Sequence, residues 1–237
     1  MPARRRSPSI GGSVMISREP SPPLFDDRAD AGRQLAAVLA DRPDVAAGPV
    51  VVLGLARGGV PVAAEVARAL SAPLGVLVVR KVGHPLQPEF GLGAVTPGGE
   101  AYVRESGGLS DEELRRVVER ASAQAAAMHE RFAGLGPPAD PEGAVCVLVD
   151  DGLATGATMI AAARWARGRR ARVVLAAVPV ASTEGVALLA PEVDEVVCPY
   201  VTDAFWAVSV WYRTFAQVED ETVAELLREA AARTRTT

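Results

Sequence analysis

One stretch decides how this chain folds: Val145-Cys-Val-Leu-Val-Asp-Asp-Gly-Leu-Ala-Thr-Gly-Ala-Thr-Met159. An apolar run ends abruptly at two carboxylates, and a loop of small residues follows. The run from Val145 to Val149 is mostly β-branched and has no polar alternation, as in a central parallel strand that is covered on both faces. The stretch therefore predicts a buried strand, a loop and the start of a helix.

The two acids, Asp150 and Asp151, stand at the carboxyl end of this strand, the edge outside which open α/β sheets bind ligands. Several loop positions carry little or no side chain, so that backbone N–H groups can approach an anion closely: Gly152, Ala154, Gly156 and Ala157. Thr155 and Thr158 add hydroxyl donors, and a helix over Met159 to Arg167 would point its free N–H groups and its dipole at the same place. A ligand with both a phosphate and sugar hydroxyls would use every part of this site.

Three other interpretations of the stretch fit it less well. An apolar strand ending in Asp-Asp also occurs beside a Gly-x-x-x-x-Gly-Lys-Ser/Thr loop, but the chain has no such loop, and Lys81 is its only lysine. A two-metal cluster would need more ligands, yet the chain has two histidines and no second acidic pair that ends a strand. An ordinary solvated turn would not account for the agreement between loop composition, acids and flanking pattern.

The stretch resembles the 5-phosphoribosyl-1-pyrophosphate (PRPP) motif of type I phosphoribosyltransferases, which has four apolar residues, two acids and then a loop rich in Gly and Thr. The resemblance implies that Asp150 and Asp151 contact the ribose hydroxyls. It also implies a 5-phosphate site in the loop, formed by Ala154, Thr155, Gly156, Ala157 and Thr158. The resemblance covers roughly residues 25–180, and the whole-chain pattern looks like a poorly characterised bacterial branch of the family.

A second strand-loop-helix unit precedes this stretch. Pro49 to Leu55 is a second apolar run, and Ala56-Arg57-Gly58-Gly59 connects it to a predicted helix over Val60 to Leu70. Two anion sites in one sheet suit a ligand with two phosphate ends, although the loop alone also fits a tight turn with an exposed arginine. In the family that the chain resembles, a loop here binds the pyrophosphate of PRPP, and Arg57 and Gly58 match its position.

Two cations end the third predicted strand, Leu74 to Lys81. That end lies at the edge that collects the anion sites, so we expect Lys81, a compact point charge, to contact a pyrophosphate oxygen and offset leaving-group charge. A solvated strand end is the alternative for the pair Arg80-Lys81. A hairpin across Thr96-Pro-Gly-Gly follows, in the region where the family carries a mobile loop, and His84 there is either a general base or a surface side chain.

Composition limits the class of protein. A chain of 237 residues with 49% hydrophobic and 23% charged residues is typical of a soluble globular protein, and no apolar run approaches the roughly 20 residues of a membrane span. The formal net charge of −4 argues against a general nucleic-acid surface. Cys146 and Cys198 lie in apolar runs without metal-ligand spacing, which favours a reducing, cytoplasmic location. We therefore expect no nucleic acid and no membrane among the partners.

The remaining elements complete an alternating order. Helices are expected from near Arg28, from the capping box Ser110-Asp-Glu-Glu113 to about Phe132, over Ser182 to Leu189, and over Asp220 to Arg233. Further strands are expected over Arg172 to Val180 and over Asp194 to Tyr200. This order predicts an α/β fold, with a mainly parallel central sheet, helices on both faces and a small C-terminal hood.

The chain divides into three predicted parts. Residues 1–24 are expected to be a disordered tail, unless translation begins at Met15, residues 25–180 a phosphoribosyltransferase core domain, and residues 181–237 the hood and a C-terminal helix. Six of the eleven aromatic residues cluster in the third part, where they form either the core of the hood or a platform for a flat base: Tyr200, Phe205, Trp206, Trp211, Tyr212 and Phe215.

The resemblance implies an enzyme of the Mg²⁺-dependent phosphoribosyltransferase class. A nitrogenous acceptor, most simply a nucleobase, would displace pyrophosphate from PRPP, with four catalytic residues: Arg57, Lys81, Asp150 and Asp151. Mg²⁺ would be bound mainly through PRPP and not by a metal site of the protein, and a homodimer is suggested by analogy. The alternative function is a regulatory protein that binds PRPP or a nucleotide without turnover, and the sequence leaves the identity of the acceptor open.

Overall fold

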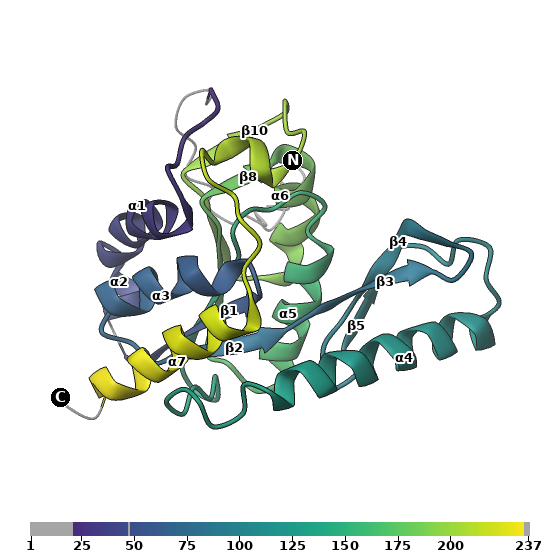
Figure 1. Ribbon diagram of the computed structural model, residues 1–237, viewed down its shortest axis with the longest axis horizontal. Helices are drawn as coiled ribbons and strands as arrows, with labels where there is room; N and C mark the ends of the chain where they lie inside the picture. The colour runs from purple at the N-terminus through teal and green to yellow at the C-terminus, as the bar shows by residue number, and fades with distance from the viewer. Residues whose placement is uncertain (1–20, 47, 235–237) are drawn as a thin grey trace, which may run out of the picture.

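A five-stranded parallel sheet forms the centre of the protein (Figure 1). The computed structural model describes residues 21–46 and 48–234, without the side chains of Asp44, Ala46, Pro88 and Glu89. The strands run in the order β2 (Leu74–Val78), β1 (Val50–Ala56), β6 (Val145–Val149), β7 (Val173–Ala177) and β9 (Glu195–Val197). Because each neighbouring pair is parallel, the carboxyl ends of these strands meet at one edge. The expected α/β fold with a mainly parallel sheet is confirmed.

Helices cover both faces of this sheet. Three of them pack against one face, namely α1 (Arg28–Ala40), α3 (Gly59–Ala69) and α7 (Asp220–Thr234), while α5 (Ala157–Gly168) packs against the other; the short α2 (Pro43–Ala46) follows α1 (Figure 1). Alternate residues of β6 enter the two cores, since Cys146 and Leu148 pack toward α5 and Val147 packs toward α1 and α3. Burial on both sides is why β6 is a continuous apolar run. Burial also raises the pKa of the Cys146 and Cys198 thiols to about 12.

A smaller unit, which we call the arm, projects from the sheet (Figure 1). It consists of the antiparallel strands β3 (Arg80–His84), β4 (Gln87–Val95) and β5 (Ala101–Val103), packed on α4 (Asp111–Glu130). The hairpin between β4 and β5 is confirmed. So is the capping box at Ser110, whose side chain accepts a hydrogen bond from the Glu113 backbone while the Glu113 carboxylate accepts one from the Ser110 backbone.

The hood lies over the carboxyl edge of the sheet. We use this name for residues 180–192 and 200–215, which contain β8 (Val180–Ser182), α6 (Thr183–Leu189), the 3₁₀ turns η1 (Ala190–Glu192) and η2 (Val208–Trp211), and β10 (Tyr200–Thr202). Phe25 joins the apolar cluster of the hood, in which most of the aromatic residues pack together as a core: Tyr200, Phe205, Trp211, Tyr212 and Phe215. Trp206 is the exception, with 89% of its surface exposed.

Three predicted strands are each split in two. The segment Leu74 to Lys81 leaves the main sheet after Val78, and Arg80 and Lys81 begin β3 of the arm, because their charged side chains stay exposed beside β4 instead of entering the covered sheet. The segments Arg172 to Val180 and Asp194 to Tyr200 break at Pro179 and Pro199, which have no N–H for the strand ladder. In both cases the second half forms the small sheet of the hood.

The division of the chain at residues 24 and 180 stays a prediction. Residues 1–20, most of the expected tail, lie outside the described residues. Beyond residue 180 the chain builds the hood, returns to the main sheet as β9, and ends on α3 as α7. No helix in the described part of the chain is both long and apolar enough to cross a membrane.

Candidate functional site

The two acids lie at the carboxyl end of β6, where the loop after β1 packs directly against them. The backbone N–H of Asp151 donates to Oδ1 of Asp150 at 2.9 Å, which orients the first carboxylate. A Cβ on Gly58 would overlap Oδ2 of Asp151, and one on Gly59 would lie 2.8 Å from Cα of Asp150. Glycine at these two positions therefore lets the loop and the acids share one small region.

Burial dominates the electrostatics of the pair. It raises the pKa of Asp150 well above its usual range; the negative charge of Asp151 adds to this, while the Asp151 N–H, Arg28 and Lys81 oppose it. Burial also raises the pKa of Asp151, against the opposing effect of Arg28.

Arg28 is a residue of this site that the sequence did not reveal. Its Nε and Nη2 both lie 2.8 Å from Oδ2 of Asp151, and its Nη1 donates to the Ala216 carbonyl at 2.7 Å. The guanidinium also stacks on the Phe215 ring, 3.8 Å from its centroid. Both charged side chains are almost buried, with exposures of 12% and 13%. The sequence carried no signal for this pair because the two residues are 123 positions apart.

The hood also contacts the backbone of Asp151 directly, in addition to the contact of Phe215 with Arg28. The Tyr212 hydroxyl donates to the Asp151 carbonyl at 2.6 Å, and a Cβ on Gly152 would lie 2.7 Å from Val208 of η2. Burial, and then the charge of Asp151, raises the pKa of Tyr212. The aromatic cluster thus serves as hood core and also fixes the backbone of the acidic loop.

The loop from Ala154 to Thr158 is held in place by β8 and α6. Ser182 donates its N–H to the Leu153 carbonyl at 2.8 Å and its Oγ–H to the Ala154 carbonyl at 2.5 Å. Gly156 precedes α5 with φ 76°, a conformation that favours glycine, and it provides no side-chain cap. The first N–H groups of α5 have no partners within the helix and are available to an anion.

Three of the five predicted phosphate-loop residues line a common cavity with Lys81. Thr155, Ala157, Thr158 and Lys81 line a cavity of about 290 Å³, together with residues of the arm that include Arg104. Ala154, Gly156 and the two acids are not among the lining residues, although Ala154 lies exposed in the same loop. Arg104 is a further cation that the sequence did not indicate for this site.

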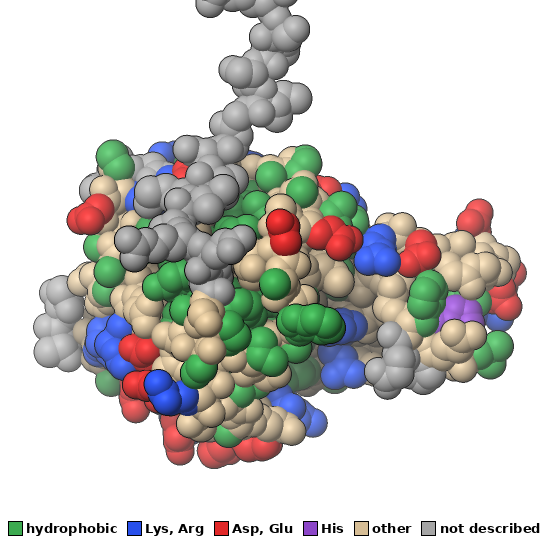
Figure 2. Space-filling view, turned by 90° about the horizontal axis from the view of Figure 1, so that it is seen from above, with side chains coloured by type: hydrophobic (Ala, Val, Ile, Leu, Met, Phe, Trp, Pro, Cys, Tyr) green, Lys and Arg blue, Asp and Glu red, His purple; other side chains and the backbone are tan. Residues whose placement is uncertain are grey.

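A second, more cationic cavity of about 620 Å³ adjoins the loop after β1. Arg57 and Lys81 line it with Arg80, from β3, and with Arg131, just beyond α4. The peptide bond between Ala56 and Arg57, at the start of this loop, is cis. Lys81 therefore belongs to both cavities, one beside each predicted anion loop. Lys and Arg side chains gather where the arm leaves the body (Figure 2).

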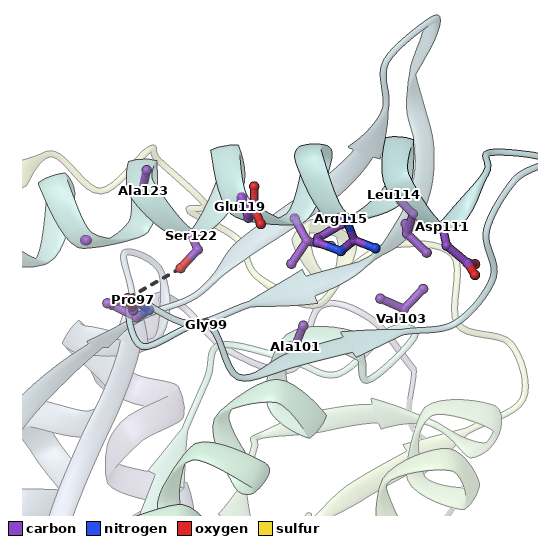
Figure 3. A pocket seen from close by; sticks show the side chains of 12 residues that line it. Pro97, Gly99, Ala101, Val103, Asp111, Leu114, Arg115, Glu119, Ser122 and Ala123 are labelled. Carbon is purple, nitrogen blue, oxygen red and sulfur yellow. Dashed lines mark hydrogen bonds between the residues drawn. The ribbon is translucent and has the colours of Figure 1, made fainter.

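Another cavity, of about 740 Å³, lies in the arm between α4 and the β4–β5 hairpin (Figure 3). Leu114 of α4 and Val103 of β5 line it, and the Ser122 hydroxyl donates to the Pro97 carbonyl of the hairpin at 3.4 Å (Figure 3). The same hydroxyl lies 3.1 Å from the Thr96 carbonyl. None of the predicted site residues lines this cavity. It is therefore separate from the site at the sheet edge.

Comparison with known proteins identifies the family. Residues 25–212 match the family model described as "Phosphoribosyl transferase domain". A Mycobacterium tuberculosis H37Rv protein, Rv0571c, which bears the provisional name of phosphoribosyl transferase, is 46% identical over 217 residues. That match covers 87% of this chain but only 47% of the M. tuberculosis protein, so the chain spans about half the length of this curated relative.

Two further relatives bear on the comparison. An adenine phosphoribosyltransferase of M. tuberculosis CDC 1551 is 36% identical over 171 residues, which is 71% of this chain and 64% of that enzyme. The crystal structure of TT1426 from Thermus thermophilus superposes with a TM-score of 0.74 at 44% identity and covers 87% of this chain and 99% of that one. The fold of most of this chain thus has a counterpart in a solved structure.

Proposed function

The chain belongs to the phosphoribosyltransferase family, and on that premise we propose that it transfers the 5-phosphoribosyl group from PRPP to a nitrogenous acceptor and releases pyrophosphate. One observation carries the proposal. Two acids and two loops suited to anions converge at one sheet edge, with Lys81 lining both adjoining cavities. PRPP has the matching chemistry, with a diol between a monophosphate and a pyrophosphate.

Each part of the site then has a role in the reaction. Asp150 and Asp151 accept hydrogen bonds from the ribose hydroxyls, and the loop from Ala154 to Thr158 holds the 5-phosphate. Arg57, Gly58 and Lys81 hold the pyrophosphate. A ring nitrogen attacks C1 of the ribose as the bond from C1 to the pyrophosphate oxygen breaks; the electron pair leaves with pyrophosphate, and the acceptor loses its proton to solvent or to a carboxylate.

The protein contributes little covalent chemistry to such a reaction. Its work is to hold donor and acceptor in line and to place charge where charge develops. The positive charge that develops on the ribose lies beside Asp150 and Asp151, and the negative charge that develops on the leaving group lies beside Arg57 and Lys81. Once the carboxylates are ionised, their burial strengthens the first of these effects, since charges interact more strongly when water is excluded.

The residues at the edge fit a magnesium ion that arrives with the substrate. No group of three or more His, Cys, Asp or Glu side chains in the described part of the chain could hold a metal ion. Mg²⁺ commonly binds through one or two carboxylates and the phosphates of a substrate, and Asp150 and Asp151 offer such carboxylates. When bound, Mg²⁺ would supply neutralisation of the pyrophosphate charge.

A nucleobase is the acceptor we propose. The 36% identity to an adenine phosphoribosyltransferase supports this class, and the hood that adjoins the acids through Tyr212 is the part of the chain we expect to contact the base. Adenine is accordingly the first base to test, followed by the other purines and the pyrimidines.

The test measures pyrophosphate release from PRPP in the presence of Mg²⁺ across a panel of nucleobases. Asp151→Asn serves as the site variant, and Glu142→Gln, which removes an exposed carboxylate at the opposite end of β6, serves as the matched control. We expect release that requires one base, continues in Glu142→Gln and falls at least about a hundredfold in Asp151→Asn.

Three outcomes would contradict parts of the proposal. Release without any acceptor would indicate hydrolysis of PRPP instead of transfer. Tight PRPP binding without release for any base would favour a regulatory binding protein. Equal release by wild type and Asp151→Asn would remove the acids from the mechanism.

A further inference from the structure

The cationic cavity beside the loop after β1 contains one acid that no role in phosphoribosyl transfer requires. Among the described residues that line it, Arg57, Arg80, Lys81 and Arg131 are cationic, and Asp220 is the single carboxylate. Asp220 is the first residue of α7, far from the other lining residues in sequence. An acid in an anion site opposes the binding of any anion, so its presence needs a reason.

The Asp220 carboxylate bridges two of the cations. Its Oδ1 lies 3.3 Å from Nη1 of Arg57, and its Oδ2 lies 2.6 Å from Nη1 of Arg131. The two guanidiniums come from different elements, since Arg57 follows β1 and Arg131 follows α4. A carboxylate that accepts from two guanidiniums occupies the geometry that a phosphate group would adopt between them.

The ordinary reason for an acid at the start of a helix does not account for this placement. An acid in the first turn stabilises a helix wherever its side chain points. Glu221, also in the first turn of α7, pairs with Arg228 of the same helix at 3.7 Å and does not line the cavity. Asp220 is directed at the two cations, so its position relates to the cavity as well as to the helix.

We propose that Arg131 is a further pyrophosphate-binding residue and that Asp220 is a displaceable carboxylate, which holds Arg57 and Arg131 together until the pyrophosphate group takes its place. The inference rests on the proposed function, because that function assigns pyrophosphate to Arg57.

The side chains of this contact are exposed enough for such an exchange. The Arg131 side chain is 66% exposed, and those of Arg57 and Asp220 are 32% and 33% exposed. An ion pair with that exposure contributes little to stability, so the fold loses little when it breaks. A pyrophosphate group offers more oxygens and more charge than one carboxylate, and would therefore displace it.

The experiment measures pyrophosphate binding by calorimetry in the presence of Mg²⁺. Asp220→Asn should lower the dissociation constant about threefold, because it removes a like charge from the site. Arg131→Gln should raise it about fivefold, and Arg131→Lys should recover part of the loss. Glu221→Gln removes the same charge from the same helix end outside the cavity, and should bind as the wild type does.

Ribose 5-phosphate provides the control for general damage. It carries no pyrophosphate, so its affinity should be equal in the wild type, Asp220→Asn and Arg131→Gln. A variant that loses ribose 5-phosphate binding as well would indicate a structural effect and contradict the specific role of Arg131.

The outcomes separate this inference from the proposed function. If pyrophosphate binds and a nucleobase drives its release from PRPP, but Asp220→Asn binds pyrophosphate no more tightly than wild type, then the displaceable carboxylate is wrong and the transferase stands. If Asp220→Asn tightens pyrophosphate binding but no base supports release, the anion site stands without the transferase. A wild type that does not bind pyrophosphate would overturn this inference, while the release assay with PRPP would still decide the proposed function.

Discussion

At the scale of single residues, Asp150 places a partly buried carboxylate where folding alone would not favour one. Burial raises its pKa in the folded protein, and the charge of Asp151 raises it further. A folded-state pKa above the unfolded value means that the native state binds more protons between the two values, so stability falls as pH rises through that window. The ionised carboxylate is thus a cost to the fold, and the proposed binding of PRPP would give it a use.

Asp150→Asn should therefore stabilise the unliganded protein at neutral pH. The gain is about 1.4 kcal/mol for each unit by which folding raises the pKa, and it should shrink toward zero once pH falls to the unfolded value of Asp. Thermal or urea unfolding of both proteins across pH measures it. A variant that is less stable than wild type at neutral pH would contradict this account of the acid pair.

Arg28 should set the protonation of Asp151. Its charge lowers the pKa of Asp151 against the opposing effect of burial, so Arg28→Gln should raise that pKa. We expect PRPP binding by Arg28→Gln to be lost at a higher pH than in wild type as the solution is acidified, with a smaller displacement in Arg28→Lys. Calorimetric titrations across pH measure it.

Arg33→Gln is the matched control for this prediction. Arg33 lies on the same helix, and its side chain is 59% exposed. Its removal should leave the pH dependence of PRPP binding as in wild type. If PRPP affinity falls at the same pH in Arg28→Gln and in wild type as the solution is acidified, the guanidinium packs on Phe215 without changing the pKa of Asp151.

At the scale of elements, the approach of the two strand-end loops depends on glycine. A Cβ on Gly59 would press on the Val149 carbonyl and on Cα of Asp150, and neither backbone can move without disturbing β6. Gly59→Ala should therefore destabilise the protein by about 1–3 kcal/mol. Gly168→Ala, at the end of α5 with open space around it, should be neutral or slightly stabilising.

Denaturant unfolding of these two variants checks the prediction. PRPP binding by Gly59→Ala, measured at low temperature where the variant stays folded, checks whether the added methyl group also disturbs the proposed PRPP site. Equal stability of Gly59→Ala and wild type would mean that the loops do not meet as described. The test separates close packing from a general sensitivity to alanine, since both substitutions add the same methyl group.

The elements of the main sheet could be predicted from sequence because their burial is continuous. β1 and β6 are apolar on both faces, and their ends are marked by glycine or by acids. Pro179 and Pro199 did indicate where two of the predicted strands break, because proline interrupts a strand ladder even within a run of β-branched residues. We predicted continuous strands there because the apolar runs continue on both sides of each proline. The exit of the chain after Val78 had a different signal, the charged pair Arg80-Lys81, which we interpreted as the end of the same strand.

At the scale of the whole molecule, local sequence patterns could not predict which distant segments contact one another. Arg28 meets Asp151, Tyr212 meets the acidic loop, and Asp220 meets Arg57 only because α1, the hood and α7 each return to the same edge of the sheet. The predicted site residues came from two loops and one strand end, each of which directly follows an apolar run in the sequence. The residues missed come from elements whose position is set by packing.

The central claim is that the edge bearing Asp150 and Asp151 binds PRPP, and one calorimetric titration of PRPP with Mg²⁺ tests it most directly. The account predicts one PRPP bound per chain by wild type and by Glu142→Gln. It predicts binding weaker by about ten- to a hundredfold in Asp151→Asn, since a charged hydrogen bond is lost. No binding by wild type, or equal binding by wild type and Asp151→Asn, would contradict it.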